Sequence, residues 1–349
     1  MFGFVTRWVP LAFSSFYNDR ILRPKRFHFA GSQTVTDKIA IFLIFPKYGV
    51  LENHLHSLRY LVANGYSPLL VSNLPLNTDD IARLKPLTWR IMQRQNFGYD
   101  FGGYLDAVLD LAPYLRQLKR LVFLNDSCWF PLAGKANWLK MAEDSGMDAY
   151  WADEHRGLPP STTTYLTFFA KTQRSYFASY AISIGEKVVQ SPNFFRFWRS
   201  LQISNGKGRT IRRGEHGLSK WLKKSGFSCD ALSKNIDLRN HLLRLSAEQF
   251  ANICRSALST KEKKYFRDLN DAEDIAASRM KKNEFIEIRV NRTGIPIVLP
   301  RFAIERQNYP FLKKSATGRK IPILRQIILD LNDPMSPQML QEFNQRYGL

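Results

Sequence analysis

The chain has 349 residues, of which 51 are Lys or Arg and 30 are Asp or Glu, so its formal net charge is +21. A hydrophobic fraction of 44% and an aromatic fraction of 13% exclude an intrinsically disordered chain, and at about 100 to 200 residues per domain the length allows one large or two modest domains. The three cysteines, Cys128, Cys229 and Cys254, include no CxxC pair. This excludes a disulfide scaffold and a zinc knuckle and indicates a reducing compartment.

The N-terminal 37 residues read as an extension, and no apolar run in the chain reaches the roughly 18 residues that span a bilayer. The stretch MFGFVTRWVPLAFSSFY is broken by Arg7 and Pro10 and is followed by the basic run RILRPKR. Either the extension packs on the fold, or it contacts a membrane surface. In the second interpretation these aromatic and basic residues meet the lipid interface: Phe2, Phe4, Trp8, Phe13 and Phe16, with Arg20, Arg23, Lys25 and Arg26.

A strand, a helix and a second strand are predicted next. Residues 38–45 are a short apolar run bounded by polar residues, which predicts a buried strand. Residues 51–64 place leucines at helical spacing and end before Gly65, and residues 67–72 predict another strand. Such a unit within about 35 residues is typical of a parallel sheet.

The alternation continues to about residue 230. We expect helices over 78–94, which Pro86 interrupts, and over 103–118, and then a buried strand over 120–124. Further predicted elements are strands at 148–151, 164–170 and 176–184 and helices at 194–201 and 218–225, with a glycine-containing basic loop at 204–214. The sequence therefore predicts an α/β part, in which ligands bind at the carboxyl ends of the strands.

The C-terminal third differs in composition. Residues 231–282 are predicted to be helical and polar, residues 286–299 carry two β-like runs, and the tail from residue 321 is predicted to be helical with proline breaks. We therefore divide the chain into an N-terminal extension (1–37), an α/β domain (38–230) and a basic, mainly helical C-terminal extension (231–349).

Two loops of the α/β part carry candidate binding residues. In QNFGYDFGGY (95–104), glycines stand beside Asn96 and Asp100, and a glycine-rich turn that opens a helix can receive a phosphate or ribose. In VFLNDSCWFP (122–131), Asp126 follows an apolar strand, where an oxygen ligand can hold Mg²⁺ or Mn²⁺ against a diphosphate. Alternatively, Asp126 and Ser127 only cap the next element.

A third candidate stretch is RRGEHGLSKWLKKSGF (212–227). Glu215 begins a predicted helix directly after a loop that carries Lys207, Arg209, Arg212 and Arg213. A carboxylate beside phosphate-binding cations is what base-assisted transfer from a diphosphate donor requires. The alternative is a glutamate that interacts only with the helix dipole.

The histidines give no metal-ligand pattern. His54 and His56 would face apart on a helix, so we expect packing or surface roles for them. Asp153, Glu154 and His155 follow a predicted strand and either line an acceptor cleft or form an ordinary polar turn.

Four motifs, taken in chain order, resemble the rhamnan synthesis protein F family of bacterial glycosyltransferases. They are N-x-G-Y-D-F-G (96–102), L-N-D-S (124–127), SYFASYAIS with SPNFFRFWRSL (175–183 and 191–201), and E-x-G-L-S-x-x-L-x-x-x-G (215–226), with a weaker echo in YPFLKK (309–314). The resemblance covers roughly residues 38–227. It implies a GT-A-like (Rossmann-like) fold with a mixed, mainly parallel sheet flanked by helices. It also implies transfer of a sugar, L-rhamnose from dTDP-rhamnose, onto a bacterial cell-surface polysaccharide or lipopolysaccharide.

The same resemblance assigns roles to residues. Asn125-Asp126-Ser127 takes the place of a DxD-type metal motif with one carboxylate in three, so Mg²⁺ or Mn²⁺ at Asp126 stays open and the basic loop 207–213 can neutralise the diphosphate instead. An inverting transfer needs a base, for which Glu215 is the first candidate and Asp100 the second. The predicted donor-binding residues are Asn96, Gly98, Tyr99, Asp100, Asn125, Asp126, Ser127, Arg212 and Arg213.

The expected partners are the nucleotide sugar, a lipid-linked or lipopolysaccharide glycan acceptor and a membrane surface. The protein would be cytoplasmic and peripheral on the inner face of the bacterial cytoplasmic membrane, which accounts for the basic charge without nucleic acid. Two alternatives remain open. One keeps the fold with another nucleotide sugar or a phosphoribosyl donor, and the other is a non-enzymatic polyanion-binding or RNA-binding protein, for which the sequence has no RRM, KH or helix-turn-helix signature.

Overall fold

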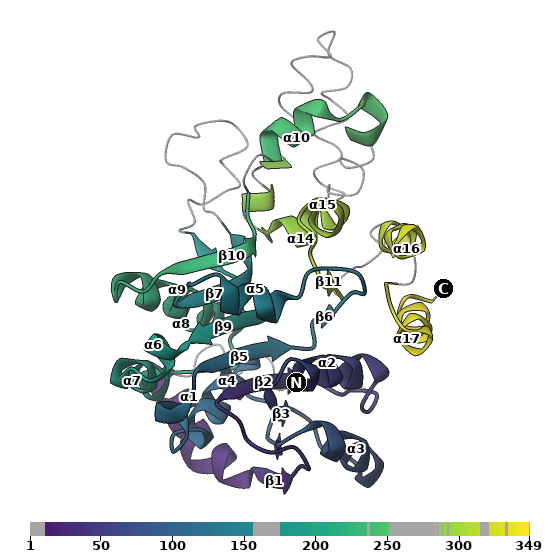
Figure 1. Ribbon diagram of the computed structural model, residues 1–349. Coiled ribbons are helices and arrows are strands. Elements are labelled where there is room, and N and C mark those ends of the chain that lie inside the picture. Colours follow the sequence, from purple (N-terminus) through teal and green to yellow (C-terminus); the bar gives the residue numbers. More distant parts are fainter. Residues whose placement is uncertain are drawn as a thin grey trace.

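A computed structural model describes residues 11–155, 175–235, 238–250, 283, 286–287, 289–291, 293–314, 321–331 and 334–348. Within these residues a nine-stranded sheet lies at the centre in the order β1-β4-β3-β2-β5-β9-β7-β10, with β8 paired to β7. Helices cover both faces of this sheet (Figure 1). Only β1, β8 and β9 run against the other strands. The predicted α/β class, a mixed, mainly parallel sheet flanked by helices, is confirmed.

Three parallel strands form the middle of the sheet: β2 (Lys38–Ile44), β3 (Ser67–Ser72) and β5 (Arg120–Asn125). They are buried on both faces, as unbroken apolar runs in a parallel sheet are expected to be. All three match their predicted ranges within one residue. The helix predicted between the first two strands is α2 (Glu52–Ala63).

Two hydrophobic cores, one on each face, hold the helices on the sheet. Odd-numbered residues of β2 pack with α4 (Tyr99–Asp110), α7 (Pro192–Ser200) and α9 (Glu215–Lys224). Even-numbered residues of β2 pack with α2 and α5 (Trp138–Asp144). This division follows from the strand period of two, which sends successive side chains to opposite faces.

A third, smaller core carries the C-terminal helices. Trp129 packs there with residues of α16 (Ile321–Asp330) and α17 (Pro337–Tyr347). Beside it, β11 (Leu312–Lys313) pairs antiparallel with β6 (Cys128–Trp129) (Figure 1). The helical tail is confirmed, and it packs directly against the segment that follows β5.

Two predicted helices have wrong boundaries. Residues 78–94 form α3 (Thr78–Leu84), a 3₁₀ turn (Lys85–Leu87) and β4 (Arg90–Gln93), because Pro86 has no N–H with which to continue the α-helix. The helix predicted over 103–118 is α4, which begins four residues earlier, after Gly98 in the left-handed conformation. A separate 3₁₀ turn follows at Leu115–Gln117.

The second half of the α/β part is also more divided than predicted. The strand predicted over 176–184 is two strands, β8 (Tyr176–Phe177) and β9 (Ala181–Gly185), and the strand predicted at 148–151 is β7 (Ala149–His155). The basic loop 204–214 contains the helix α8 (Lys207–Arg213). The polar and basic composition of these residues predicts a loop. The segment is nevertheless helical, and α8 packs beside α4 and α9.

The C-terminal predictions are wrong at two points. Residues 231–282 begin with β10 (Cys229–Ser233) and α10 (Leu238–Arg244), and residues 251–282 lie outside the described residues, as does the predicted strand 164–170. Residues 286–299 are not strands, since their described part is helical and includes α14 (Ile295–Val298). The β-branched residues there pack into the core of the α2 face, and that packing overrides strand propensity.

The described part of the N-terminal extension lies against the fold. It contains α1 (Leu11–Tyr17) and β1 (Phe27–Ala30), which pairs antiparallel with β4. Arg23 forms an ion pair with Asp106 on α4 at 2.8 Å. The predicted division at 37 therefore falls inside one sheet, and β10 likewise crosses the division at 230. No described helix is long and apolar enough to cross a membrane.

Candidate active site

Asp126 lies where the strand order of the sheet reverses. The chain passes from β2 to β3 and β4 on one side and then returns to β5 on the other side of β2. Ligands of open α/β sheets bind in the crevice at the carboxyl ends of strands at such a point. Asp126 bridges the two strand ends: the Phe45 N–H donates to its Oδ2 at 2.8 Å, and its own N–H donates to the Leu43 carbonyl at 3.0 Å.

The surroundings of Asp126 stabilise its charged form. Its Oδ2 lies 3.4 Å from Nε2 of His54, a residue that is buried in the first turn of α2. Burial by itself would raise the pKa of Asp126, but His54, the charge of Lys314 and the Phe45 N–H outweigh burial and lower the pKa. His54 is buried against Phe42, as the expected packing role requires, and its ring also contacts a site carboxylate, which the sequence did not predict.

A cavity of about 1320 Å³ opens beside Asp126. The loop after β2 (residues 45–49) forms one wall, and the segment 313–314 and the helix α17 contribute another. Its cationic lining residues are Lys47, Lys313, Lys314 and Arg346. The site thus includes C-terminal residues that the predicted catalytic domain leaves out. The echo in YPFLKK was the available signal for two of them.

A second cavity of about 410 Å³ adjoins the first, and Ser127 and Lys313 line both. The second cavity brings together Asp100 from α4, Asn125 from the end of β5 and Glu215 from α9. These three predicted residues come from segments that are far apart in the chain. The structure thus collects most of the predicted site at one edge of the sheet.

Asp100 has the environment of a proton acceptor. Its Oδ2 accepts a hydrogen bond from Nδ2 of Asn125 at 2.9 Å. Burial raises the pKa of Asp100 to about 6; Asp126 and Glu215 add to this, and Lys313 opposes it. A carboxylate whose pKa lies near the working pH is well matched to general-base catalysis.

Glu215 is held at the first position of α9. Its Oε1 accepts a hydrogen bond from the Ser179 N–H at 2.7 Å, which fixes the carboxylate in the wall of the smaller cavity. The basic residue that α8 adds to this wall is Lys207. Arg212 and Arg213 are exposed on α8 and line neither cavity.

In the motif 95–104, backbone conformation and close packing require the glycines. Gly98 has φ 79°, and its N–H donates to Asn205 Oδ1 at 2.9 Å. A Cβ at Gly102 would lie 1.9 Å from the Phe97 carbonyl oxygen. Asn96 is exposed and lines neither cavity, whereas Tyr99 lines the smaller one.

A histidine of the smaller cavity is backed by a buried acid. His155 Nε2 lies 3.0 Å from Oδ2 of Asp153, and His155 Nδ1 lies 2.8 Å from the Tyr176 hydroxyl. Burial raises the pKa of Asp153, against the effect of His155. The prediction of a polar turn for 153–155 is wrong, because all three residues belong to β7. Of the three, His155 lines the smaller cavity, and Asp153 and Glu154 do not.

The residues around Asp126 do not by themselves fit a divalent metal ion. Among the described residues no group of three or more His, Cys, Asp and Glu side chains is placed to hold one. Asp126 Oδ2 is already engaged by Phe45 and His54, and Asn125 Oδ1 accepts the Ser127 hydroxyl at 2.5 Å. Mg²⁺ keeps several waters and takes one or two carboxylates together with substrate phosphates, and the carboxylate available at this strand end is Asp126. Positive charge from the protein is supplied here by Lys313 and Lys314.

Comparison with known sequences gives a family match. Residues 69–278 match the profile described as rhamnan synthesis protein F. The uncharacterized protein y4gN of Sinorhizobium fredii is 31% identical over 222 residues, which cover 60% of this chain and 54% of that protein. Virulence protein VirA of Vibrio anguillarum is 25% identical over 276 residues, covering 74% and 82%. The chain thus spans about half the length of the Sinorhizobium relative.

Solved structures give a weaker likeness. Core-mannan synthase A from Aspergillus fumigatus, in its Mn/GDP form, is similar with a TM-score of 0.32 and 10% identity over 55% of this chain and 71% of that chain. The mannosyltransferase Ktr4p from S. cerevisiae in complex with GDP gives a TM-score of 0.30 and 10% identity over 57% and 71%. The metal and nucleotide in those structures belong to those two proteins.

Proposed function

The chain belongs to the rhamnan synthesis protein F family, and from this premise we propose that it is a GT-A-like glycosyltransferase that uses a nucleotide-sugar donor. The donor is dTDP-L-rhamnose and the acceptor a bacterial cell-surface polysaccharide or lipopolysaccharide. The observation that carries the proposal is the pair of joined cavities at the switch point of the sheet. The larger cavity has four Lys or Arg side chains against two carboxylates, the smaller cavity contains the candidate bases Asp100 and Glu215, and Ser127 and Lys313 line both.

The two cavities suit the two halves of a sugar transfer. The donor diphosphate lies in the larger cavity, the anomeric carbon at the junction and the acceptor hydroxyl in the smaller cavity. The acceptor oxygen forms a bond to the anomeric carbon while the bond from that carbon to the diphosphate oxygen breaks, and the diphosphate leaves with the electron pair. The hydroxyl proton passes to a carboxylate. Attack opposite the leaving group inverts the configuration.

Glu215 and Asp100 are the proposed proton acceptors. Glu215 keeps one oxygen on the Ser179 N–H, which leaves the other for the acceptor hydroxyl. Asp100 is favoured by its raised pKa. Asn125, Asp126 and Ser127 hold the donor from the strand end, and His155, which lines the smaller cavity, orients the acceptor.

The proposed acceptor is lipid-linked, and we therefore place the protein on the inner face of the cytoplasmic membrane. Three exposed aromatic residues, Phe13, Phe16 and Tyr17, share one face of the N-terminal helix because they are three and four positions apart. Arg20 and Lys25 follow and are exposed. Aromatic side chains beside cations suit an anionic interface.

A donor panel tests the function. Purified full-length protein is mixed with dTDP-rhamnose, UDP-glucose, GDP-mannose and a phosphoribosyl diphosphate, and its melting temperature and the release of free sugar are measured. A ligand that binds only the folded state raises the melting temperature, and we expect dTDP-rhamnose to give the largest rise and the only sugar release. Selective response to another donor would reassign the substrate. Response to none of them, with salt-sensitive binding of RNA, would favour the polyanion-binding class.

A further inference from the structure

Two consecutive lysines reach the site from the C-terminal third of the chain. The pairing of β11 with β6 sets Lys313 opposite Cys128, and the Lys314 N–H donates to the Ser127 carbonyl at 2.9 Å. Backbone hydrogen bonds thus tie these lysines to the segment that carries Asp126. Successive residues of a strand point to opposite sides, which agrees with Lys313 lining both cavities and Lys314 only the larger one.

Lys314 is a nearly buried cation that forms no ion pair with the described residues, although the charges of Asp126 and Glu342 act on it from a greater distance. The residue is 7% exposed, and its ammonium group makes no hydrogen bond or ion pair with any described residue. Its aromatic neighbour is Trp129, whose ring centroid is 4.8 Å from Nζ. Burial lowers the pKa of Lys314, and Asp126 opposes that effect. A buried charge without an ion pair lowers the stability of the folded protein unless another interaction compensates for its lost hydration. A bound anion would supply that compensation.

Lys313 stands at the junction of the cavities. Its Nζ donates to the Ser127 hydroxyl at 3.1 Å and lies 3.3 Å from the ring centroid of Tyr180. Both contacts are to neutral groups, so the positive charge is not cancelled. The same charge acts on Asp100 in the smaller cavity, whose pKa it lowers.

The other charges of the larger cavity also favour an anion. Its carboxylates are Asp126 and Glu342. Glu342 accepts hydrogen bonds from the N–H groups of Glu52 and Asn53, the first two residues of α2. Those helix N–H groups are therefore occupied, and the cationic donors that an anion meets in this cavity are Lys47, Lys313, Lys314 and Arg346. At about 1320 Å³ the cavity has room for a nucleoside diphosphate.

We propose that Lys313 and Lys314 bind the diphosphate of the donor and neutralise it as it leaves, in the place where a divalent ion would otherwise be required. This rests on the proposed donor class. When the bond from the diphosphate oxygen to the anomeric carbon breaks, that oxygen gains a negative charge, and Lys313 at the junction lies beside it. Lys314 holds the diphosphate from deeper in the larger cavity. The C-terminal third of the chain is thereby part of the active site.

The test is calorimetric titration of the full-length protein with dTDP and with pyrophosphate, in buffer with EDTA and in buffer with Mg²⁺. We expect wild-type protein to bind both ligands in EDTA. Lys314→Met and Lys313→Met should each weaken binding about tenfold to hundredfold, since each removes a charge-assisted contact to phosphate. The matched control is Lys224→Met, which removes the same charge from an exposed position at the end of α9, and its affinity should equal that of the wild type.

Thermal unfolding separates a binding role from a structural one. Without ligand, Lys314→Met should melt at the same temperature as the wild type or higher, because the substitution removes an unpaired buried charge and keeps a similar shape. With dTDP its melting temperature should rise less than that of the wild type. A variant that melts well below the wild type yet binds dTDP normally would make Lys314 a structural residue and overturn the proposal.

The remaining outcomes of the titrations test the lysine site separately from the proposed donor class. Binding of dTDP that requires Mg²⁺ and is unchanged in both lysine variants would overturn the lysine site and leave the donor class intact. If wild-type protein binds no nucleoside diphosphate in either buffer, the donor class fails, and the lysine site fails with it.

Discussion

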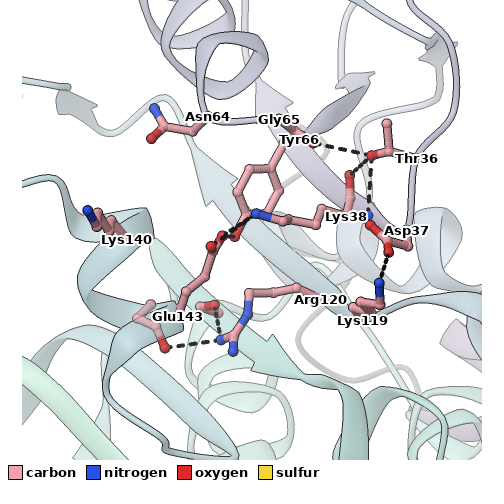
Figure 2. Close-up of polar contacts among 12 residues, drawn as sticks. Thr36, Asp37, Lys38, Asn64, Gly65, Tyr66, Lys119, Arg120, Lys140 and Glu143 are labelled. Atoms are coloured by element: carbon pink, nitrogen blue, oxygen red, sulfur yellow. Dashed lines mark hydrogen bonds and ion pairs between the residues drawn. The ribbon is translucent and has the colours of Figure 1, made fainter.

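The charged side chains at the two ends of the central sheet differ in whether they are paired with other protein groups. At the amino end, Lys38 Nζ lies 3.0 Å from both carboxylate oxygens of Glu143, and the Tyr66 hydroxyl donates to the same carboxylate at 2.6 Å (Figure 2). Arg120 donates to the Ser183 hydroxyl at 3.0 Å. Lys38 and Glu143 form an ion pair, and Arg120 donates to protein oxygens, so the network needs no ligand to be complete.

At the carboxyl end the charges face cavities. Lys314 has no ion pair among the described residues, Asp100 has a raised pKa, and Glu215 is held by a single backbone N–H. Charged groups that are not paired inside the protein cost stability, and they persist where function requires them. The comparison thus predicts that substitutions at the two ends have opposite effects on stability and on activity.

The largest expected effect is at Glu215. Glu215→Gln keeps the shape and the hydrogen bond to Ser179 but removes the proton acceptor, so kcat should fall by roughly 10² to 10⁴ with little change in donor affinity. The measurement is steady-state kinetics beside calorimetric donor titration. The control is Glu186→Gln at the exposed first position of helix α6 (Glu186–Val189), which should keep normal kcat. Near-normal kcat in Glu215→Gln would move the base to Asp100.

Asp100→Asn should separate activity from stability. The pKa of Asp100 in the folded protein, about 6, is above its ordinary value of 3.8. The folded state therefore binds more protons than the unfolded state between these values, and its stability falls as pH rises through them. Asp100→Asn removes this loss, so its free energy of unfolding at pH 7.5 should exceed that of the wild type by about 3 kcal/mol.

The pH dependence provides the check on Asp100. Denaturant unfolding at several pH values should show the excess stability of Asp100→Asn shrinking toward pH 4. If Asp100 also takes the acceptor proton, wild-type kcat should fall as pH drops through about 6. If Asp100→Asn is less stable than the wild type at pH 7.5, the Asp100 carboxylate does not lower the stability of the folded protein, and the contrast between the two ends of the sheet fails at this residue.

Glu143→Ala tests the amino end. The substitution leaves the buried Tyr66 hydroxyl and the Lys38 ammonium without their acceptor, so the free energy of unfolding should fall by about 1 to 3 kcal/mol. Turnover should not change, because Glu143 lies at the edge of the sheet opposite both cavities. Lys119→Ala, which removes an exposed ion pair with Asp37, is the matched control and should leave stability almost unchanged. Lost turnover in a folded Glu143→Ala protein would break the comparison.

The fold was predictable where the sequence is locally unambiguous. The strands β2, β3 and β5 are unbroken apolar runs with polar ends, and they match within one residue. Residues 286–299 were not predictable in this way, because β-branched residues of a helix that packs in a core give the same local signal as a strand. Only contacts with distant segments decide between the two.

The candidate site divides along the same line. Asp100, Asn125 and Asp126 could be found because each follows or opens an element whose position the sequence predicts. For Lys313 and Lys314 the sequence offers only the weak family echo in YPFLKK and no sign of their position, since β11 pairs with a two-residue strand that lies more than 180 residues earlier in the chain. Nothing in the local pattern of YPFLKK indicates that pairing. The sequence instead predicts that the basic loop 207–213 neutralises the diphosphate, because the charges of that loop are adjacent in sequence.

The smallest expected effect is at Arg212 and Arg213. Both are exposed on α8 and line neither cavity, so they act on the donor only at a distance through solvent. At an ionic strength of about 0.15 M charges are screened beyond roughly 8 Å, so Arg212→Ala and Arg213→Ala should each weaken dTDP binding by less than about threefold. The loss should disappear at high salt, whereas the loss in Lys314→Met should remain because that charge is buried. Titrations of the three variants at two salt concentrations measure this difference. A tenfold loss of dTDP affinity that persists at high salt in either arginine variant would place the diphosphate beside α8. It would also remove the contrast between exposed and buried cations on which the lysine site depends.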